Sequence, residues 1–346
     1  MSPSGPVKPV RIICILLCAL CVGLRVQANE TSLYDGAKRE GAVTWYITHY
    51  SGELAQEAGH KFTDKYPGVM VNVVRTTAQV AFAKLSQDIK VGVPSCDVFS
   101  STDIGHYIEL KKTGLIAQFE PESAQQISPQ FVKFIDAGYY YPTSVGLVLI
   151  TYNSKMVSAD DVPRNWTDLL DPKWQGKVTV AHPAFSGYAG AWALQMRMLY
   201  GVAFLQKLEK NKPLIGRSIN DSVTRLNSGE SVIAAGADNT TLESASRGNP
   251  LAIVYPTDGT ILMVSPSSIM KNAPHPNAAR LFMEYLLSAD YSEVMVKHAA
   301  LPVRSGIAAP RGLKPLNEIR LIRPNDAELV AGIPSIIEDW RDVFGN

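Results

Sequence analysis

The feature that most constrains the fold is an alternation of short apolar strands with amphipathic helices. A predicted strand at residues 43–47 is followed by a helix that begins at about Ser51. One face of this helix carries an apolar residue at every fourth position, namely Leu54, Ala58, Phe62 and Tyr66. Strand–helix–strand order needs crossover connections, so it predicts a mainly parallel sheet covered by helices.

The same alternation continues along the chain. Further strands are predicted at 69–74, 97–99, 146–152, 177–181, 231–235 and 251–255, and further helices at about 78–89, 104–112, 187–200 and 276–288. The pattern pauses at residues 138–142, and neither a repeat nor a flexible linker separates the two halves. We therefore predict two α/β lobes joined by crossing strands rather than two tethered domains.

Residues 1–28 have the organisation of a secretory signal peptide. Lys8 and Arg11 precede an apolar run at 12–24, and Ala28 ends a small-residue cleavage motif. The run is shorter than the roughly 20 residues that a bilayer span needs. A retained membrane anchor and a lipid anchor at Cys21 are the alternatives.

The composition excludes several functional classes. Hydrophobic residues make up 46% of the 346 residues and the net charge is +1, so the chain can bury a core and lacks the basic excess of nucleic-acid-binding proteins. Removal of residues 1–28 leaves Cys96 as the single cysteine, which we expect in the core. An exported protein without disulfides fits the bacterial periplasm.

Motifs of catalysis are mostly missing. The chain has no His-Glu-x-x-His, no Gly-x-Ser-x-Gly and no Gly-x-Gly-x-x-Gly, and its six histidines show no metal-pair spacing. We therefore expect no enzyme activity, no metal and no cofactor. A Ser/His/Asp triad is defined by geometry rather than by order in the sequence, so a secreted hydrolase is the alternative from another class.

Polar residues cluster where predicted strands end and helices begin. They are Thr48, His49, Ser51, Thr76, Thr77, Ser100 and Ser101 in the first half and Ser186, Gly187, Asn239 and Thr240 in the second. The carboxyl ends of parallel strands share one edge, and free N–H groups at helix N-termini attract anions. We predict a shared cleft that binds a carboxylate or a phosphate. The alternative is that each Ser or Thr only caps its helix.

Three other positions have two interpretations each. His49 either contacts a ligand or hydrogen-bonds within its loop. The aromatic run at residues 139–141 either lines the cleft, with Tyr141 as the candidate, or packs between lobes. Asp258 is either a turn residue, or it contacts a cationic group of the ligand or holds the hinge.

Three stretches give the chain a resemblance to a known family. They are Leu-Asp-Pro-Lys-Trp-Gln-Gly-Lys-Val at 170–178, Val-Tyr-Pro-Thr-Asp-Gly-Thr at 254–260, and the segment 273–288, which begins Ala-Pro-His-Pro. From about residue 40 to its end, the chain resembles periplasmic solute-binding proteins of bacterial ABC importers, in the branch of ferric-iron, thiamine, phosphonate and sugar-phosphate binders. The resemblance implies the two-lobed type II periplasmic-binding-protein fold. In this α/β fold each lobe is a mainly parallel sheet flanked by helices, and the cleft between them closes around a ligand.

The resemblance also implies lobe limits and partners. Lobe 1 would comprise residues 29–140 and about 256–294, and lobe 2 residues 141–255 and about 295–346. The protein would be a periplasmic monomer that delivers a small molecule to an ABC permease and its ATPase. It would meet the membrane only through the permease and would bind no nucleic acid.

The ligand is a separate question. Iron-binding members of the branch place two adjacent tyrosines after the strand that here ends near Gly236, where this chain has Asn239, Thr240 and Thr241. Amide and hydroxyl groups are poorer ligands for Fe(III) than phenolates, and a thiamine-type ligand would favour aromatic stacking beside an acid. The Ser- and Thr-rich loops favour a small anionic organic or phosphorylated solute. Ferric iron and thiamine are the alternatives on the same fold.

Overall fold

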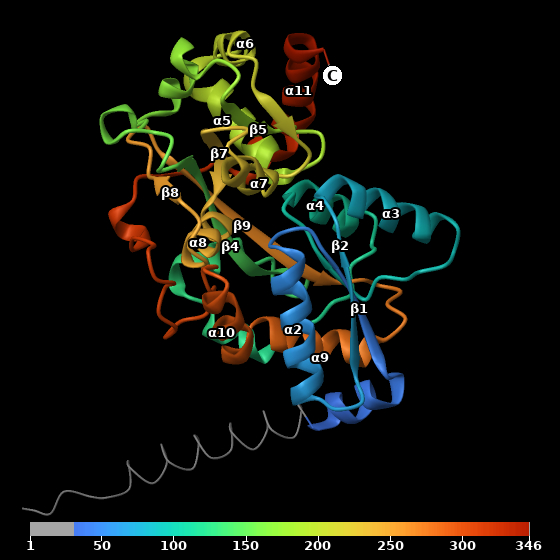
Figure 1. Cartoon of the computed structure of the whole chain (residues 1–346). Helices are drawn as coiled ribbons and strands as arrows, with labels where there is room; N and C mark the ends of the chain where they lie inside the picture. Colours follow the sequence, from blue (N-terminus) through green and yellow to red (C-terminus); the bar gives the residue numbers. More distant parts are fainter. Residues whose placement is uncertain (1–30, 346) are drawn as a thin grey trace, which may run out of the picture.

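Two long strands join the two halves of this computed structural model, which describes residues 31–345 (Figure 1). β4 (Tyr141–Asn153) and β9 (Thr260–Ile269) pair antiparallel and link both lobes into one sheet, in the order β2-β1-β3-β9-β4-β7-β5-β6. The signal peptide predicted at residues 1–28 lies outside the described residues. No helix in the described part of the chain has the length and apolar character of a membrane span.

Lobe 1 begins with a helix at residues 31–40 and continues with three parallel strands and their crossover helices. Its elements are β1 (Ala42–Ile47), α2 (Gly52–Lys65), β2 (Met70–Arg75), α3 (Ala78–Lys90), β3 (Val98–Ser100) and α4 (Ile104–Lys112). β1 pairs in parallel with both β2 and β3, and β3 docks antiparallel on β9. The predicted alternation is therefore confirmed here, and the buried face of α2 carries the predicted Leu54, Ala58 and Phe62.

Lobe 2 repeats the same organisation on β4. Its elements are β5 (Val178–Ala181), α5 (Gly187–Tyr200), α6 (Ala203–Lys210), β6 (Leu214–Gly216), α7 (Asp221–Ser228), β7 (Ile233–Ala237) and α8 (Asp238–Ser246). β5 pairs in parallel with β6 and β7, and β7 docks antiparallel on β4. Each lobe is thus a parallel sheet attached to one of the two crossing strands.

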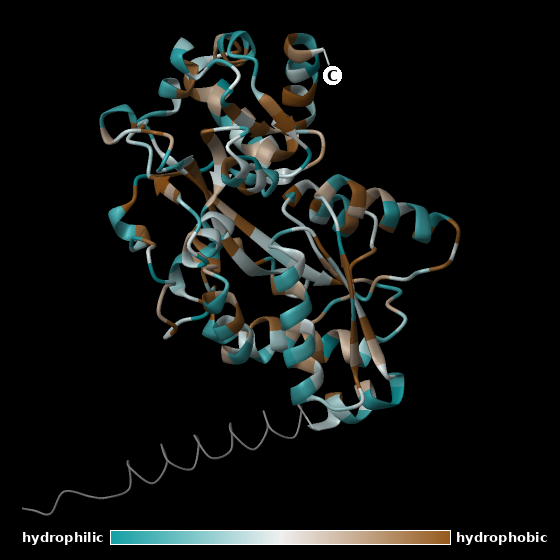
Figure 2. Cartoon of the chain, in the orientation of Figure 1, coloured by the Kyte–Doolittle hydropathy of each residue, from teal (hydrophilic) through white to brown (hydrophobic). Residues whose placement is uncertain are grey.

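The remaining elements cover the two lobes. They are β8 (Leu251–Val254), α9 (Pro276–Leu286), α10 (Ala289–Lys297), β10 (Leu321–Ile322), α11 (Asp326–Phe344) and short 3-10 helices at 122–126, 129–134, 159–161, 166–170, 172–174 and 316–318. α9 packs on β1 and α10 on α2, whereas α11 lies against α5 and α6 and also touches α4. Figure 2 shows the strands mostly brown and the exposed side of α2 mostly teal. The lobe limits stay a prediction.

Two features of the crossing strands differ from the expectation. β4 begins at Tyr141, inside the pause predicted at 138–142, and β9 was not predicted at all. β9 carries serines and Pro266, which weaken a strand pattern. Its buried Ser267 hydroxyl lies 2.5 Å from the hydroxyls of both Ser100 and Thr143. These hydroxyls satisfy one another, so polar residues are tolerated inside the sheet. Cys96 is buried, as expected.

Candidate functional site

The carboxyl ends of the strands from both lobes meet between the lobes. The tightest approach joins Gly187, the first residue of α5, to the loop between β3 and α4. A Cβ atom added to Gly187 would lie 2.4 Å from the carbonyl oxygen of Thr102. Only glycine fits this contact, so lobe 2 touches lobe 1 directly at the N-terminus of α5.

Tyr50 adopts a backbone conformation that non-glycine residues rarely take. Its φ is +69°, in the left-handed region. Its carbonyl oxygen accepts hydrogen bonds from Nε of Arg75 at 2.9 Å and from Nη2 at 2.8 Å. The Tyr50 hydroxyl is buried beside the hydroxyl of Ser144. Strain of this kind, held by specific contacts, is concentrated at functional sites.

Asp238 is a buried carboxylate without a cation. It opens α8 directly after β7, is 0% exposed, and its Oδ1 accepts the backbone N–H of Leu147 at 3.0 Å. Its Oδ2 has no hydrogen-bond partner within residues 31–345. Burial raises the pKa of Asp238 to about 7, and backbone hydrogen bonds offset part of the rise. Retaining such a group costs stability, because a buried charge is normally paired.

Two serines from the crossing strands lie on the floor of the site. Ser144 of β4 pairs in register with Ser265 of β9, next to a bulge that follows Pro142. Bulges of this kind re-aim side chains near functional sites. Both hydroxyls are buried, and in the described structure neither forms a hydrogen bond with good distance and angle, although both lie near Tyr188.

Tyr188 of α5 reaches over the same floor. A Cβ atom added to Gly146 would lie 2.7 Å from the Tyr188 hydroxyl, so this hydroxyl rests on β4 two residues beyond Ser144. Burial raises the pKa of Tyr188, with a smaller contribution from Asp238, and the nearby Ser144 and Ser265 hydroxyls lower it slightly. Burial also holds the pKa of Tyr50 well above its usual range, with contributions from Tyr188 and Asp238. These effects place the side chains in one cluster.

His49 and Arg75 form the other end of the site. Burial, followed by the charge of Arg75, lowers the pKa of His49 to about 3, so the ring is neutral. Neither ring nitrogen has a partner in the described structure. The Arg75 guanidinium donates only to the carbonyl oxygens of Tyr50 and Thr76, and it makes no ion pair within residues 31–345. Burial lowers the pKa of Arg75, and Asp221 of lobe 2 partly offsets this.

Several residues predicted for the site are occupied by contacts within lobe 1. Thr48 accepts the N–H of Thr102 at 3.0 Å, and Ser51 caps α2 at Leu54. The Ser100 hydroxyl forms hydrogen bonds with Trp45 and Ser267, and the Ser101 hydroxyl forms one with His106. At these four positions the hydroxyl groups hydrogen-bond within the protein. Such contacts fit the alternative given above, in which these residues stabilise the fold and do not bind a ligand.

The other predicted residues divide into two groups. Thr77 precedes α3 without a side-chain cap and Thr76 lies beside it, while Ser186 caps α5 at a long 3.5 Å. Asn239 Nδ2 and Thr240 Oγ1 are buried without partners in the described structure, next to Asp238.

Tyr141 and Asp258 lie apart from this cluster. The Tyr141 hydroxyl accepts the N–H of Gly138 at 2.9 Å. Asp258 accepts the N–H of Trp166 at 2.9 Å and the hydroxyl of Tyr200, at the end of α5 opposite Gly187. These contacts fit packing for Tyr141 and the hinge-holding interpretation for Asp258.

Sequence reasoning missed six residues of the cluster. They are Tyr50, Arg75, Ser144, Tyr188, Asp238 and Ser265. Arg75 is the last residue of β2, and Asp238 directly follows β7. The search for polar residues at strand ends selected the neighbours Thr76 and Asn239, so it missed each of these residues by one position. The two serines lie inside crossing strands and carried no such signal.

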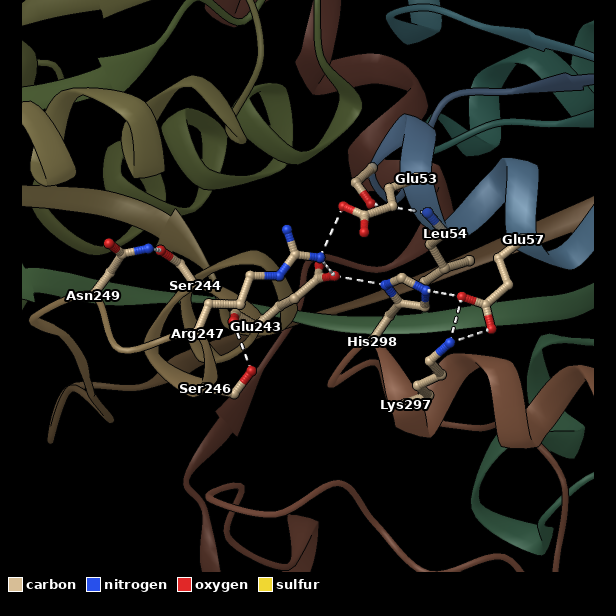
Figure 3. Close-up of polar contacts among 11 residues, drawn as sticks. Glu53, Leu54, Glu57, Glu243, Ser244, Ser246, Arg247, Asn249, Lys297 and His298 are labelled. Carbon is tan, nitrogen blue, oxygen red and sulfur yellow. Dashed lines mark hydrogen bonds and ion pairs between the residues drawn. The ribbon is translucent and has the colours of Figure 1, made fainter.

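A second set of contacts clasps the lobes beside the hinge (Figure 3). His298, which follows α10, is buried, and its Nδ1 lies 2.6 Å from Oε1 of Glu243 on α8. Its Nε2 lies 3.0 Å from Oε2 of Glu57 on α2. Arg247 pairs with Glu53 at 2.8 Å on the exposed side. The exposed pair contributes little, so His298 is the main polar link of this clasp.

Comparison with known proteins identifies the family. Residues 94–326 match the family described as bacterial extracellular solute-binding protein, and the chain belongs to it. An uncharacterized protein of Haemophilus influenzae is 24% identical over 317 residues, covering 88% of this chain and 90% of that protein. A Salmonella typhimurium protein named putative 2-aminoethylphosphonate-binding periplasmic protein is 23% identical over 246 residues, covering 66% and 70%.

Solved structures confirm the predicted type II fold. The periplasmic binding protein AfuA from Actinobacillus pleuropneumoniae, with fructose-6-phosphate bound, gives a TM-score of 0.79 at 21% identity, covering 88% of this chain and 99% of that chain. Iron-bound HitA from Pseudomonas aeruginosa gives 0.74 at 21% identity, covering 87% and 99%. The family is one of substrate-binding proteins rather than enzymes, and it confirms the predicted role as the periplasmic substrate-binding component of an ABC transporter.

Asp238→Asn should stabilise the ligand-free protein at alkaline pH. The native pKa of Asp238, about 7, exceeds the ordinary value of 3.8, so the native state loses stability as pH rises between them. The full difference corresponds to roughly 4 kcal/mol as an upper limit. Denaturant unfolding should show the variant to be more stable at about pH 8, with the difference shrinking toward about pH 4. The exposed Asp160→Asn is the control. Equal stability at both pH values would contradict a buried ionised carboxylate.

Gly187→Ala should hold the lobes apart. The added methyl group meets the Thr102 carbonyl at 2.4 Å, and neither backbone yields easily. We expect a larger radius of gyration by small-angle X-ray scattering than for the wild type. Gly52→Ala is the matched control, because its Cβ would have no atom within 4 Å. An unchanged radius would show that this contact does not limit closure.

His298→Ala should weaken the clasp beside the hinge. The substitution leaves Glu57 and Glu243 without their shared partner, which should cost about 1–3 kcal/mol of unfolding free energy. His60→Ala, on the exposed side of α2, is the control. A loss no larger in His298→Ala than in His60→Ala would remove His298 from the clasp.

Proposed function

We propose that the protein captures a small solute carrying an oxyanion, either phosphorylated or an organic anion, in the cleft between its lobes. The observation that carries this proposal is the half-buried guanidinium of Arg75, which has no ion-pair partner within residues 31–345 and lies beside a neutral histidine. A cation held only by carbonyl oxygens leaves positive charge for an incoming anion.

The donors at this end suit an oxyanion. A guanidinium has five N–H groups, and the contacts to Tyr50 and Thr76 use three of them. The remaining two can bind a phosphoryl or carboxylate group, with geometry that arginine supplies better than lysine. The neutral His49 ring offers one further donor, and Thr77 stands at the N-terminus of α3, directly after β2 and Arg75.

The relatives support a phosphorylated or phosphonate ligand. One curated relative is named for 2-aminoethylphosphonate, and a structural relative holds fructose-6-phosphate. Delivery to an ABC permease and its ATPase follows from the family role, and we propose that the mature protein acts as a periplasmic monomer after removal of residues 1–28.

Ferric iron is the second candidate. The hydroxyls of Tyr50 and Tyr188 lie in the same cluster as Asp238, and phenolate and carboxylate oxygens suit Fe(III). Burial raises the pKa of both tyrosines, which opposes phenolate formation without the metal. This opposition is why the oxyanion is favoured.

Arg75→Gln should weaken ligand binding. Thermal-shift screening of phosphate esters, phosphonates, organic acids, thiamine and ferric citrate identifies the ligand, because stabilisation grows with ligand concentration over Kd. For a phosphoryl or carboxylate ligand, loss of a charged hydrogen-bond donor should cost about 1.5–3 kcal/mol, roughly 10- to 100-fold in Kd. Arg39→Gln, an exposed cation of lobe 1, is the control. Wild-type affinity in Arg75→Gln, or stabilisation by iron alone, would overturn the proposal.

A further inference from the structure

The two ends of the cleft carry opposite charges that do not neutralise each other. Arg75 donates only to carbonyl oxygens, and Asp238 accepts only from backbone N–H groups. Tyr50 spans the interval between them. Its carbonyl oxygen receives the guanidinium, and its hydroxyl end lies in the cluster of Asp238. The cation therefore lies at the backbone of Tyr50, and the anion belongs to the cluster at its hydroxyl end.

The Asp238 end holds a buried carboxylate without a cation. Oδ2 of Asp238 is fully buried and accepts no hydrogen bond in the described structure. The hydroxyls of Ser144, Ser265 and Tyr50 lie in the same cluster, where Ser144 is close to Tyr50 and both serines are close to Tyr188. The adjacent Asn239 Nδ2 is a buried donor without a partner among the described residues. No lysine, arginine or histidine of residues 31–345 forms an ion pair with this carboxylate. A second anionic group of a ligand placed here would face a buried acid and would be repelled. A group with several N–H donors and a positive charge would satisfy the carboxylate and the hydroxyls together.

We propose that the ligand is a small zwitterion whose ammonium group binds Asp238, Ser144 and the Tyr50 hydroxyl while its oxyanion binds Arg75. Asp238 is then the specificity-determining residue of the cleft. The inference rests on the proposed function, which already places the oxyanion at Arg75. The inference adds a second group of opposite charge to the ligand, so that a plain anion of the same size binds more weakly.

The pH dependence of binding distinguishes an ammonium group at Asp238 from a neutral hydroxyl group at the same place. Burial raises the pKa of Asp238 to about 7, so the carboxyl loses its charge as pH falls below that value. An ammonium ligand needs the ionised form, and its affinity should fall with acidification. The other titratable groups that face the cluster are Tyr50, Tyr188 and Tyr255, whose raised pKa values keep them neutral throughout this range. At the far end, His49 stays neutral and Arg75 stays charged.

The test uses the mature protein and a matched series of alkylphosphonates and ω-aminoalkylphosphonates with one to three carbons between the groups. Calorimetry at about pH 7.5 should find one aminated member at least about tenfold tighter than its amine-free partner. Asp238→Asn should remove this preference, so that the aminated and amine-free partners bind the variant within about threefold of each other. Asp160→Asn should keep the preference. Between about pH 7.5 and 6, the ratio of the two affinities should fall in the wild type and stay constant in Asp238→Asn.

The outcomes separate the two proposals. Equal affinity for the aminated and amine-free partners, or a preference that survives Asp238→Asn, would overturn the zwitterion while binding at Arg75 still supported the proposed function. Tighter binding of a hydroxyalkylphosphonate than of its amino analogue would overturn the zwitterion in the same way. Binding of none of the phosphonates, nor of the corresponding amino and plain carboxylates, would overturn the zwitterion, and failure of phosphate esters to bind as well would overturn the proposed function.

Discussion

The antiparallel pairing of β4 with β9 is the interaction on which the rest of the structure depends. Each strand carries one lobe, because β3 docks on β9 and β7 docks on β4. The same pairing sets Ser144 opposite Ser265 and therefore places two hydroxyls at the floor of the cleft. A slip of one residue in this register would end the pairing of the two serines and turn the serine of the slipped strand to the other face of the sheet. Hinge and binding-site floor are thus consequences of one ladder of hydrogen bonds.

The cleft gathers groups that a purely structural core would avoid. His49 is buried with two unpartnered nitrogens, Tyr50 holds a left-handed φ, and Asp238 is a carboxylate without a cation in the described structure. Each unsatisfied buried group costs about 1–3 kcal/mol. By contrast, Ser100 and Ser267 sit equally deep and satisfy each other. We propose that the unpartnered groups of this cluster are the ones that a ligand contacts.

This difference also explains how far the sequence could be interpreted. The alternation of strands and helices predicted the bounds of α4 and α5. Apolar spacing predicted the buried face of α2, because that spacing decides which face of a helix is buried. The sequence also predicted polar residues at strand ends, and His49, Asn239 and Thr240 do follow strands, whereas their role in binding stays a prediction. It did not separate Ser101, which hydrogen-bonds His106, from Thr240, which bonds nothing in the described structure, because both are hydroxyls at strand ends. That distinction depends on partners contributed by distant segments. Tyr188, for example, reaches the floor only because Gly146 leaves room for its hydroxyl.

The unpartnered groups also define how a ligand can drive closure. A ligand shifts the balance between open and closed forms only by as much as it favours one of them. Moving a two-state balance from 1:99 to 99:1 takes about 5.5 kcal/mol. Arg75 and His49 belong to lobe 1 and Asp238 to lobe 2, so a ligand that bridges them gains its second set of contacts only when the lobes meet. If the ligand provides hydrogen-bond partners for several of these buried groups, at about 1–3 kcal/mol each, the total reaches the free energy that closure needs. A ligand that reached only Arg75 would bind both forms nearly equally and would leave the lobes where they were.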